Sequence, residues 1–437
     1  MEELISFQTH LNNYYVNIFQ SEKSLNQILF FLKDLEIKLL EVNKKSLLQN
    51  NARYLSEDFK PQKEVFKITV KNSDLKSRLD LYGYSNDNLE ENFNLNKKKK
   101  IDSLNKLNFL HKKNKAYPVF GATETKQEEK EFLENFTFEE YKKSVKTIIN
   151  NQYRKQIICS NLGNVREDIW TDRYGFPSHI NNVAQRYIIE NFFHGFFDDD
   201  LVNFTSILES LDGESDIDFI FPLEDFDNKE EKYKRIEDTI NHNSQYRPIK
   251  LITEGFSDSI YLTEALQQNN DTLIPYFNFH DFNGKDGGWQ KVVSLLKAYN
   301  EINAHEIIIG IFDNDKAGID GLMEVNKIRS TNIGAIKLPD LDNLKEFCVY
   351  NTITEDYGQS NVNSKSACIE LYLDKHYFRD EIKLSLNRKT QLPQLDKSSK
   401  KAIAIKFDGC DKNELDWSDL NKVWDEIIEK SKALLLL

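Results

Sequence analysis

The sequence lacks any apolar run that could cross a membrane. Ile307–Phe312 near the centre and Ala433–Leu437 at the end are much shorter than the roughly 20 residues that a membrane-spanning helix needs. The start, Met1–Leu4, has neither the basic nor the apolar segment of a secretory signal. We therefore expect a cytoplasmic protein with no membrane association, long enough at 437 residues for two or three domains.

Cysteine is scarce, and its spacing does not suit a metal site. We expect reduced thiols and no zinc module from the four scattered residues Cys159, Cys348, Cys368 and Cys410. A glycine-rich phosphate-binding loop followed by lysine is also missing. Any ATPase that works with this protein must therefore be another chain.

Positive charge is in deficit, with a formal net charge of −13. This argues against a general electrostatic attraction to nucleic acid, although bound metal ions could supply positive charge locally. The exception is Lys97–Lys115, with eight lysines against Asp102. It is either a nucleic-acid contact surface, with Phe109 and Tyr117 available for stacking, or a solvated loop between helices. The candidate nucleic-acid-binding residues are Lys97, Lys98, Lys99, Lys100, Lys112, Lys113 and Lys115.

The first 245 residues are expected to form a mainly α-helical region. Ser24–Leu48 and residues 129–158 carry apolar side chains at steps of three and four residues, the period of one helix face. Acidic residues crowd 212–247, which indicates a boundary or linker. Arg235 and His242 have a spacing that ribonucleases use, but it also fits an exposed linker helix.

From residue 246 the pattern changes to strands alternating with helices, which is typical of an α/β domain with a parallel sheet. In such sheets functional residues gather where the strands end. The expected strands are Ile249–Thr253, Leu273–Phe279, Glu306–Phe312 and Gly334–Leu338, and the expected helices are Ser257–Gln268, Trp289–Tyr299 and Ala317–Arg329. A glycine-bearing turn (Gly284, Gly287, Gly288) precedes the second helix.

Three acids follow these strands. Glu254 ends the first strand, and Asp313 and Asp315 end the third. Residues two apart in an extended segment face the same way, so the two aspartates can converge on one ion. Hard oxygen ligands of this kind favour Mg²⁺ or Mn²⁺. For a single acid such as Asp258, capping of the following helix is the simpler interpretation.

Two segments resemble the signature motifs of the Toprim domain. Ile252–Asp258 contains Glu-Gly, and Phe312–Gly318 contains Asp-Asn-Asp, with 59 positions between the glutamate and the first aspartate. Topoisomerases, bacterial primases, recombination proteins, ribosomal-RNA maturases and OLD-family nucleases share this domain. Further segments resemble the bacterial HEPN/Toprim-associated family, namely Arg78–Tyr84, Tyr246–Pro248, Lys337–Leu341 and Ile369–Leu373.

This resemblance implies a domain division and roles for residues. A mainly helical region (1–245), suited to recognising a partner or nucleic acid, would precede a Toprim catalytic domain (246–345) with a four-stranded, mostly parallel sheet. Residues 346–437 would be an extension packed on it. The resemblance implies metal binding by Glu254, Asp258, Asp313 and Asp315, and a catalytic role for Lys337 near the scissile phosphate. Asp340, Asp342 and Glu370 are further candidate acids.

The implied activity is Mg²⁺- or Mn²⁺-dependent hydrolysis of phosphodiester bonds in DNA or RNA, including transfer RNA, within an anti-phage or related conflict system. A second subunit, an ATPase partner or a homo-oligomer would complete the assembly. The main alternative is a non-catalytic binding or regulatory subunit of a defence or toxin–antitoxin-like complex. A receiver-like or phosphatase-like domain would explain Asp313 and Asp315 but not Glu254-Gly255.

Overall fold

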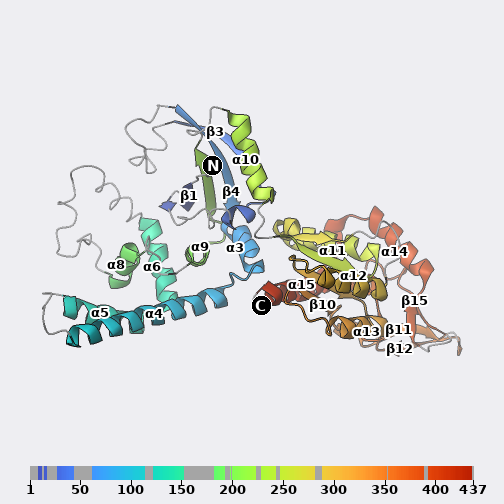
Figure 1. Cartoon of the computed structure of the whole chain (residues 1–437). Helices are drawn as coiled ribbons and strands as arrows, with labels where there is room; N and C mark the ends of the chain where they lie inside the picture. The colour runs from blue at the N-terminus through green and yellow to red at the C-terminus, as the bar shows by residue number, and fades with distance from the viewer. Residues whose placement is uncertain are drawn as a thin grey trace. The chain divides into compact units, whose positions relative to one another are not determined.

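A computed structural model describes residues 8–11, 14–16, 27–43, 62–113, 122–151, 182–191, 197, 199–222, 228–242, 247–280, 288–351, 353–387 and 392–435. The chain divides into two compact units (Figure 1). Unit 1 comprises Met1–Asp80 and Tyr84–Tyr246, and unit 2 comprises Leu81–Gly83 and Arg247–Leu437. Each unit has its own sheet and its own buried apolar side chains.

Unit 1 contains a five-stranded antiparallel sheet in the order β2-β1-β5-β4-β3. Its strands are β1 (Gln8–Leu11), β2 (Tyr14–Val16), β3 (Lys38–Asn43), β4 (Gln62–Lys71) and β5 (Asp216–Pro222). Along β5, Ile217, Phe219 and Phe221 are fully buried and alternate with polar or partly exposed neighbours. This period of two places their side chains on one face of the strand, which is the face that covers the core.

Helices make up the rest of unit 1 where it is described. An aromatic cluster joins several of them, because the ring of Phe93 on α4 lies 5.4 to 5.7 Å from the rings of Phe136, Phe138 and Tyr141. Such packing buries large apolar areas between helices. The helices are α3 (Asn72–Leu81), α4 (Asn86–Lys113), α5 (Ala122–Asn135), α6 (Phe138–Asn151), α8 (Val183–Asn191), α9 (Asp200–Leu208) and α10 (Lys229–His242).

The prediction of a mainly helical region before residue 246 missed this sheet. Ser24–Leu48 is not one helix, because residues 27–30 are the helical ones among its described residues and Lys38–Asn43 is strand β3. The buried apolar side chains end at Leu32, and beyond it Leu39 and Leu40 pair with Phe66 and Val65 of β4. Pairing with a distant strand therefore overrides the local helical period there.

Two other predictions for unit 1 also need correction. The acidic segment 212–247 is not a simple boundary, because β5 lies inside it and pairs with β1 and β4. In the stretch Lys97–Lys115, residues 97–113 are not a loop but part of α4, and the last two lie outside the described residues.

Unit 2 is built on a parallel four-stranded sheet, as the sequence predicts. The order is β10-β8-β6-β7, formed by β6 (Ile249–Thr253), β7 (Phe277–Phe279), β8 (Ile308–Phe312) and β10 (Ile333–Lys337). Strand β7 is shorter than predicted, because Asp271–Tyr276 forms a 3₁₀ helix. Of the predicted glycine-bearing turn, Gly284 and Gly287 lie outside the described residues.

Helices cover both faces of this sheet: α11 (Phe256–Asn270), α12 (Trp289–Glu301), α13 (Lys316–Val325) and α15 (Ser418–Leu435) (Figure 1). On β8, Gly310 lies against Leu296 of α12, and Phe312 lies against Gly321 of α13. The register partner of Ile309, Gly334 on β10, lies against Lys430 of α15. Because neighbouring residues of a strand face opposite sides, α12 and α13 cover one face and α15 covers the other.

The chain after the parallel sheet adds short strands and α14 (Lys397–Gly409). A second sheet, in the order β12-β11-β14-β15, contains β11 (Phe347–Asn351), β12 (Asp356–Ser360), β14 (Leu384–Leu386) and β15 (Pro393–Leu395). A two-stranded pairing joins β9 (Asn314–Asp315) to β13 (Ser366–Ala367). This pairing brings the segment around residue 366 beside the end of β8.

None of the helices in the described ranges has the length and apolar character needed to cross a membrane.

Candidate active site

Glu254 follows β6 at the carboxyl edge of the parallel sheet, where two backbone groups hold its carboxylate. Its Oε1 accepts a hydrogen bond from the Asp313 N–H at 3.0 Å, and the Trp289 N–H donates a second one. Burial raises the pKa of the Glu254 carboxyl to about 7, and the charges of Asp315 and Asp258 also raise it. A carboxyl with this pKa can take up and release a proton near neutral pH.

Asp258 lies in the first turn of α11, and it both caps that helix and faces other acids. Its Oδ2 accepts from the Gly255 N–H at 2.8 Å, and its Oδ1 accepts from the Ser257 hydroxyl at 3.3 Å. A Cβ at Gly255 would lie only 3.1 Å from Oδ1, so the close approach favours glycine there. Burial, followed by the charge of Glu370, raises the pKa of Asp258 to about 6.

Asp313 and Asp315 leave β8 beside Glu254. Burial raises the pKa of Asp313 well above its usual range, and the charges of Asp258 and Glu254 add to this rise. Asp315 is the N-cap of α13, where its Oδ1 accepts from the Gly318 N–H at 2.7 Å. A Cβ at Gly318 would lie 2.0 Å from the Asp313 carbonyl oxygen, so only glycine lets the backbone pass this close.

Glu370 and Lys400 join the cluster from the C-terminal part of the chain. Glu370 lies in the 3₁₀ helix Ile369–Tyr372, just after β13, and its side chain is 3% exposed. Its Oε1 forms an ion pair with the Lys400 Nζ at 3.1 Å, while its buried Oε2 has no hydrogen-bond partner among the residues that the structure describes. Burial disfavours the charge of Lys400, but Cys368, Glu370 and Asp313 outweigh it and raise the pKa of Lys400.

Lys400 is a residue that the sequence reasoning did not single out. It lies in the first turn of α14, more than 140 positions after Glu254 and outside every motif. The N-cap of α14, Asp396, accepts from the Ser399 N–H at 2.8 Å and so fixes the start of that turn. A positive charge in the first turn of a helix is repelled by the positive end of the helix dipole. This unfavourable position of a lysine is the signal in the sequence that could have indicated a role for Lys400.

Lys337 lies at the end of β10, where its amine already has partners. Its Nζ lies 2.8 Å from Asp340 Oδ1 and 3.1 Å from Asn314 Oδ1. The hydrogen bond from Lys337, and then the one from Asn314, lower the pKa of Asp340. Asp342 stays outside this group, because it is exposed and pairs with Lys345. The structure therefore places Lys337 next to the middle residue of Asp-Asn-Asp.

The structure brings Glu254, Asp258, Asp313 and Asp315 to one edge of the sheet, with Glu370 beside them. As the side chains stand, no three His, Cys, Asp or Glu side chains in the described parts of the chain converge to hold a metal ion. The residues nevertheless suit a divalent cation, because Glu370 Oε2 is buried without a partner and the buried carboxyls raise one another's pKa values. A cation would relieve both effects.

The lysines on α4 divide into two kinds. The Lys97 Nζ donates to the Phe136 carbonyl oxygen at 2.9 Å, and Lys100 lies 5.7 Å from the ring centre of Tyr187. Lys98 and Lys99 are exposed. Lys112 and Lys113 belong to α4, but their side chains, like the whole of Lys115, lie outside the described part of the structure.

Arg235 and His242 lie on helix α10, which agrees with the interpretation of that segment as a helix. The Arg235 guanidinium pairs with Glu231 at 3.2 Å, one turn earlier on the same helix. The side chain of His242 is not among the described ones.

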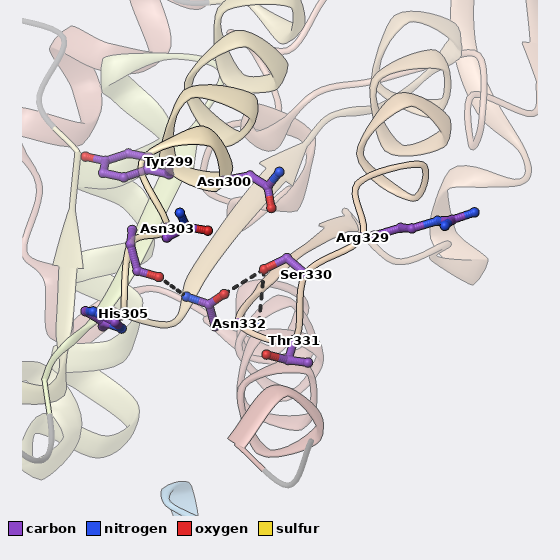
Figure 2. Close-up of a pocket in the computed structure, with 9 residues that line it drawn as sticks. Tyr299, Asn300, Asn303, His305, Arg329, Ser330, Thr331 and Asn332 are labelled. Atoms are coloured by element: carbon purple, nitrogen blue, oxygen red, sulfur yellow. Dashed lines mark hydrogen bonds between the residues drawn. The ribbon is translucent and has the colours of Figure 1, made fainter.

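A polar pocket of about 730 Å³ lies at the opposite, amino edge of the parallel sheet (Figure 2). Asn332 organises it: its Nδ2 donates to the carbonyl oxygens of Ala304 and Glu306 at 2.5 and 2.8 Å, and its Oδ1 accepts from Ser330 at 2.6 Å. Figure 2 shows Arg329 pointing away from the other side chains. No acid is among the described residues that line this pocket, so it offers no metal ligands of the carboxylate type.

Comparison with known proteins identifies the first part of the chain. Residues 3–241 match the family model described as HEPN/Toprim N-terminal domain 1, which covers more than half of the chain. No curated protein and no solved structure matches the chain. The protein is therefore a member of the HEPN/Toprim-associated family.

Proposed function

We propose that this protein is a Mg²⁺- or Mn²⁺-dependent nuclease whose active site is the acid cluster of Glu254, Asp258, Asp313 and Asp315. The observation that carries the proposal is that Glu254, Asp258 and Asp313 lie partly buried at the carboxyl edge of a parallel sheet, with pKa values raised by burial and by neighbouring carboxylates. Buried like charges are costly, and active sites are where proteins retain them. The Toprim-like order of the motifs and the family membership agree with this activity.

The four acids are the residues that would hold the ion, with Glu370 Oε2 as a further oxygen donor. When bound, the ion would polarise a phosphate and lower the pKa of a water molecule. Glu254 is oriented by the N–H groups of Asp313 and Trp289, and its pKa near 7 suits it to accept a proton at a carboxylate oxygen.

Two lysines supply positive charge around the acids. Lys400 lies against Glu370 and interacts electrostatically with Asp313, while Lys337 lies against Asn314 between the two aspartates. Either ammonium group can offset the negative charge that develops on a phosphate during hydrolysis. Lys400 is the stronger candidate, because its amine interacts directly with the buried acids.

The substrate on this proposal is DNA or RNA, including transfer RNA, and the biological setting is anti-phage defence or a related conflict system in the cytoplasm. The net charge of −13 means that the acid cluster needs help to hold a polyanion. The helical residues around Lys97–Lys113, a second copy of the chain or a partner subunit such as an ATPase would provide it.

The second candidate function is that of a non-catalytic binding or regulatory subunit. The observation in its favour is that Asp258 and Asp315 already cap α11 and α13, so each has a structural role without a metal. This candidate leaves the buried, unpartnered Oε2 of Glu370 unexplained.

The experiment is cleavage of plasmid, single-stranded DNA and transfer RNA by the purified protein with Mg²⁺ or Mn²⁺, alone and with its partner. Glu254→Gln and Asp313→Ala should abolish cleavage, and so should chelation of the metal. Asp320→Ala is the matched control, because Asp320 is an exposed acid on α13. If both variants cleave as well as the wild type, the acid cluster is not the active site.

A further inference from the structure

A pocket of about 680 Å³ lies beside the second sheet of unit 2, formed around β11, β12 and β14. From its lining we infer that this pocket binds a single strand of nucleic acid through its phosphates and one stacked base. The inference rests on the proposed nuclease function and names where the substrate is held. The residues that carry the argument are Tyr350, Tyr357, Lys375, Arg379 and Lys383.

Two tyrosines form an aromatic platform in the pocket. Tyr350 on β11 and Tyr357 on β12 are direct cross-strand partners, and their ring centres lie 5.1 Å apart at an interplanar angle of 54°. Tyr357 is 69% exposed, so most of its ring is available to another molecule. Exposed aromatic rings held on a rigid strand pair suit stacking with the bases of single-stranded nucleic acid.

Three cations lie around this platform without acidic partners. Lys375, Arg379 and Lys383 are all exposed, and none of them forms an ion pair within the described part of the chain. This contrasts with Lys345 and Lys406 nearby, which pair with Asp342 and Glu381. In a protein with a net charge of −13, three free cations around one pocket are a local attraction for a polyanion.

The two acids in the lining weaken this attraction little. Asp396 is engaged as the N-cap of α14, where it accepts hydrogen bonds from the Ser399 N–H and the Ser398 hydroxyl. Glu346 is exposed at the start of β11. Without counting His376, the described lining holds three cations and two anions. One of the anions, Asp396, makes its hydrogen bonds to the first turn of α14.

The pocket is connected to the acid cluster by α14. Asp396 lines the pocket and caps this helix, and Lys400, one turn further on, pairs with Glu370. One helical turn is about 5.4 Å long. A strand that lies in the pocket is therefore held beside the helix that carries Lys400.

The test measures binding of labelled oligonucleotides without cleavage. The full chain carrying Glu254→Gln is titrated against fluorescent oligothymidylate and oligouridylate of about 16 nucleotides, by anisotropy at several salt concentrations. The wild type in EDTA is the parallel sample, in case the variant does not fold. Comparison of the two oligomers shows whether DNA or RNA is preferred.

Two pocket variants are compared in this assay. Removing three phosphate contacts, in Lys375→Ala/Arg379→Ala/Lys383→Ala, should weaken binding at least tenfold and reduce the slope of log K against log salt by about 2. Tyr357→Ala should weaken binding about tenfold with little change in that slope, and Tyr357→Phe should bind like the parent. The charge-matched control is Lys297→Ala/Lys327→Ala/Lys432→Ala, which removes three lysines that already have acidic partners.

The inference is overturned if the parent binds neither oligomer, if the pocket triple variant binds like the control, or if polyglutamate competes as well as the oligonucleotides do. It is supported if the pocket variants alone lose binding. Its failure is separable from that of the proposed function. If the wild type cleaves and the pocket variants bind as the parent does, only the inference about the pocket is overturned. If binding depends on the pocket but no cleavage occurs, only the proposed nuclease function is overturned.

Discussion

The two edges of the parallel sheet in unit 2 accommodate buried polar side chains in opposite ways. At the amino edge, Asn332 is neutral, and both the nitrogen and the oxygen of its amide have partners, namely two backbone carbonyls and the Ser330 hydroxyl. At the carboxyl edge, Asp313 and Glu254 are buried next to each other, and their pKa values are raised by burial and by neighbouring charges. Strand β8 borders both arrangements, with Glu306 before its first residue and Asp313 after its last.

This difference separates structural from functional polar groups. The amino-edge pocket is roomy, at about 730 Å³, yet both polar atoms of its central side chain, that of Asn332, are hydrogen-bonded. The carboxyl edge has electrostatic repulsion between its acids that Lys400 relieves only in part, because the pKa values of Asp258 and Asp313 stay raised. Residues that conflict with their surroundings are retained where function requires them, so the second edge is the better candidate site.

The substitution Asp313→Asn is the strongest test of this difference between the two edges. It should reduce cleavage about 10²- to 10³-fold, because a ligand charge is lost. It should also raise the free energy of unfolding, because a buried like charge next to Glu254 disappears. Cleavage rates and urea unfolding measure the two effects. Loss of both activity and stability would show that Asp313 has a structural role instead.

The second prediction concerns metal binding at the same edge. Mn²⁺ or Mg²⁺ at a hundred times its dissociation constant should stabilise the wild type by about 2.7 kcal/mol. Asp313→Asn should remove most of this stabilisation, and Asn332→Ala should keep it. Thermal unfolding with and without metal is the measurement. Equal stabilisation of the wild type and Asp313→Asn would locate the ion elsewhere.

The third prediction is a dependence of stability on pH in metal-free buffer. The pKa of Glu254 is raised from 4.5 to about 7 and that of Asp258 from 3.8 to about 6, so the folded state binds more protons than the unfolded state between these values. Stability is therefore greatest at low pH within this window and falls as the pH rises from about 4 to 7. At about 1.4 kcal/mol per pKa unit, the two shifts together should change the free energy of unfolding by on the order of 6 kcal/mol.

Glu254→Gln tests the source of this dependence. The variant should show a flatter profile of unfolding free energy between pH 5 and about 7, because one of the two shifted groups no longer titrates. Asp320→Ala is the control, since Asp320 is exposed on α13. A profile of Glu254→Gln that matches the wild type would assign the titration to other residues.

The smallest expected effect is at the amino edge. Asn332→Ala should lower the free energy of unfolding by about 1–2 kcal/mol, because the carbonyl oxygens of Ala304 and Glu306 lose their donor. Cleavage by this variant should equal that of the wild type at a temperature where both are folded. A variant that is stable but inactive would contradict the division between the two edges.

Much of unit 2 could be predicted from the sequence, because its signals are local. Each strand of the parallel sheet is a short apolar run, and Glu254 and Asp313 follow directly after two of them. Strand order and helix positions then bring the carboxyl ends together. The assignment of the four acids as metal ligands, and of Lys337 as a catalytic residue, remains a prediction.

Unit 1 shows why the rest was missed. Along β5, the buried Ile217, Phe219 and Phe221 alternate with Asp216, Asp218 and the partly exposed Ile220, a short strand period that lies within a strongly acidic segment. Pairing of β5 with β1 and β4 joins segments about 150 to 210 residues apart. No local pattern reports such a contact. The same holds for Lys400, whose partner Glu370 is 30 positions away and belongs to a different element.

The place of Lys400 in the chain also affects how the protein is made. A ribosome completes the segments with Glu254 and Asp313 well before it adds α14. During that time the two acids lack the ammonium group of Lys400. The full set of charges exists only after the last third of unit 2 has been synthesised and has folded back. For the proposed nuclease, this order delays the assembly of the charged cluster until the segment that carries α14 has been synthesised.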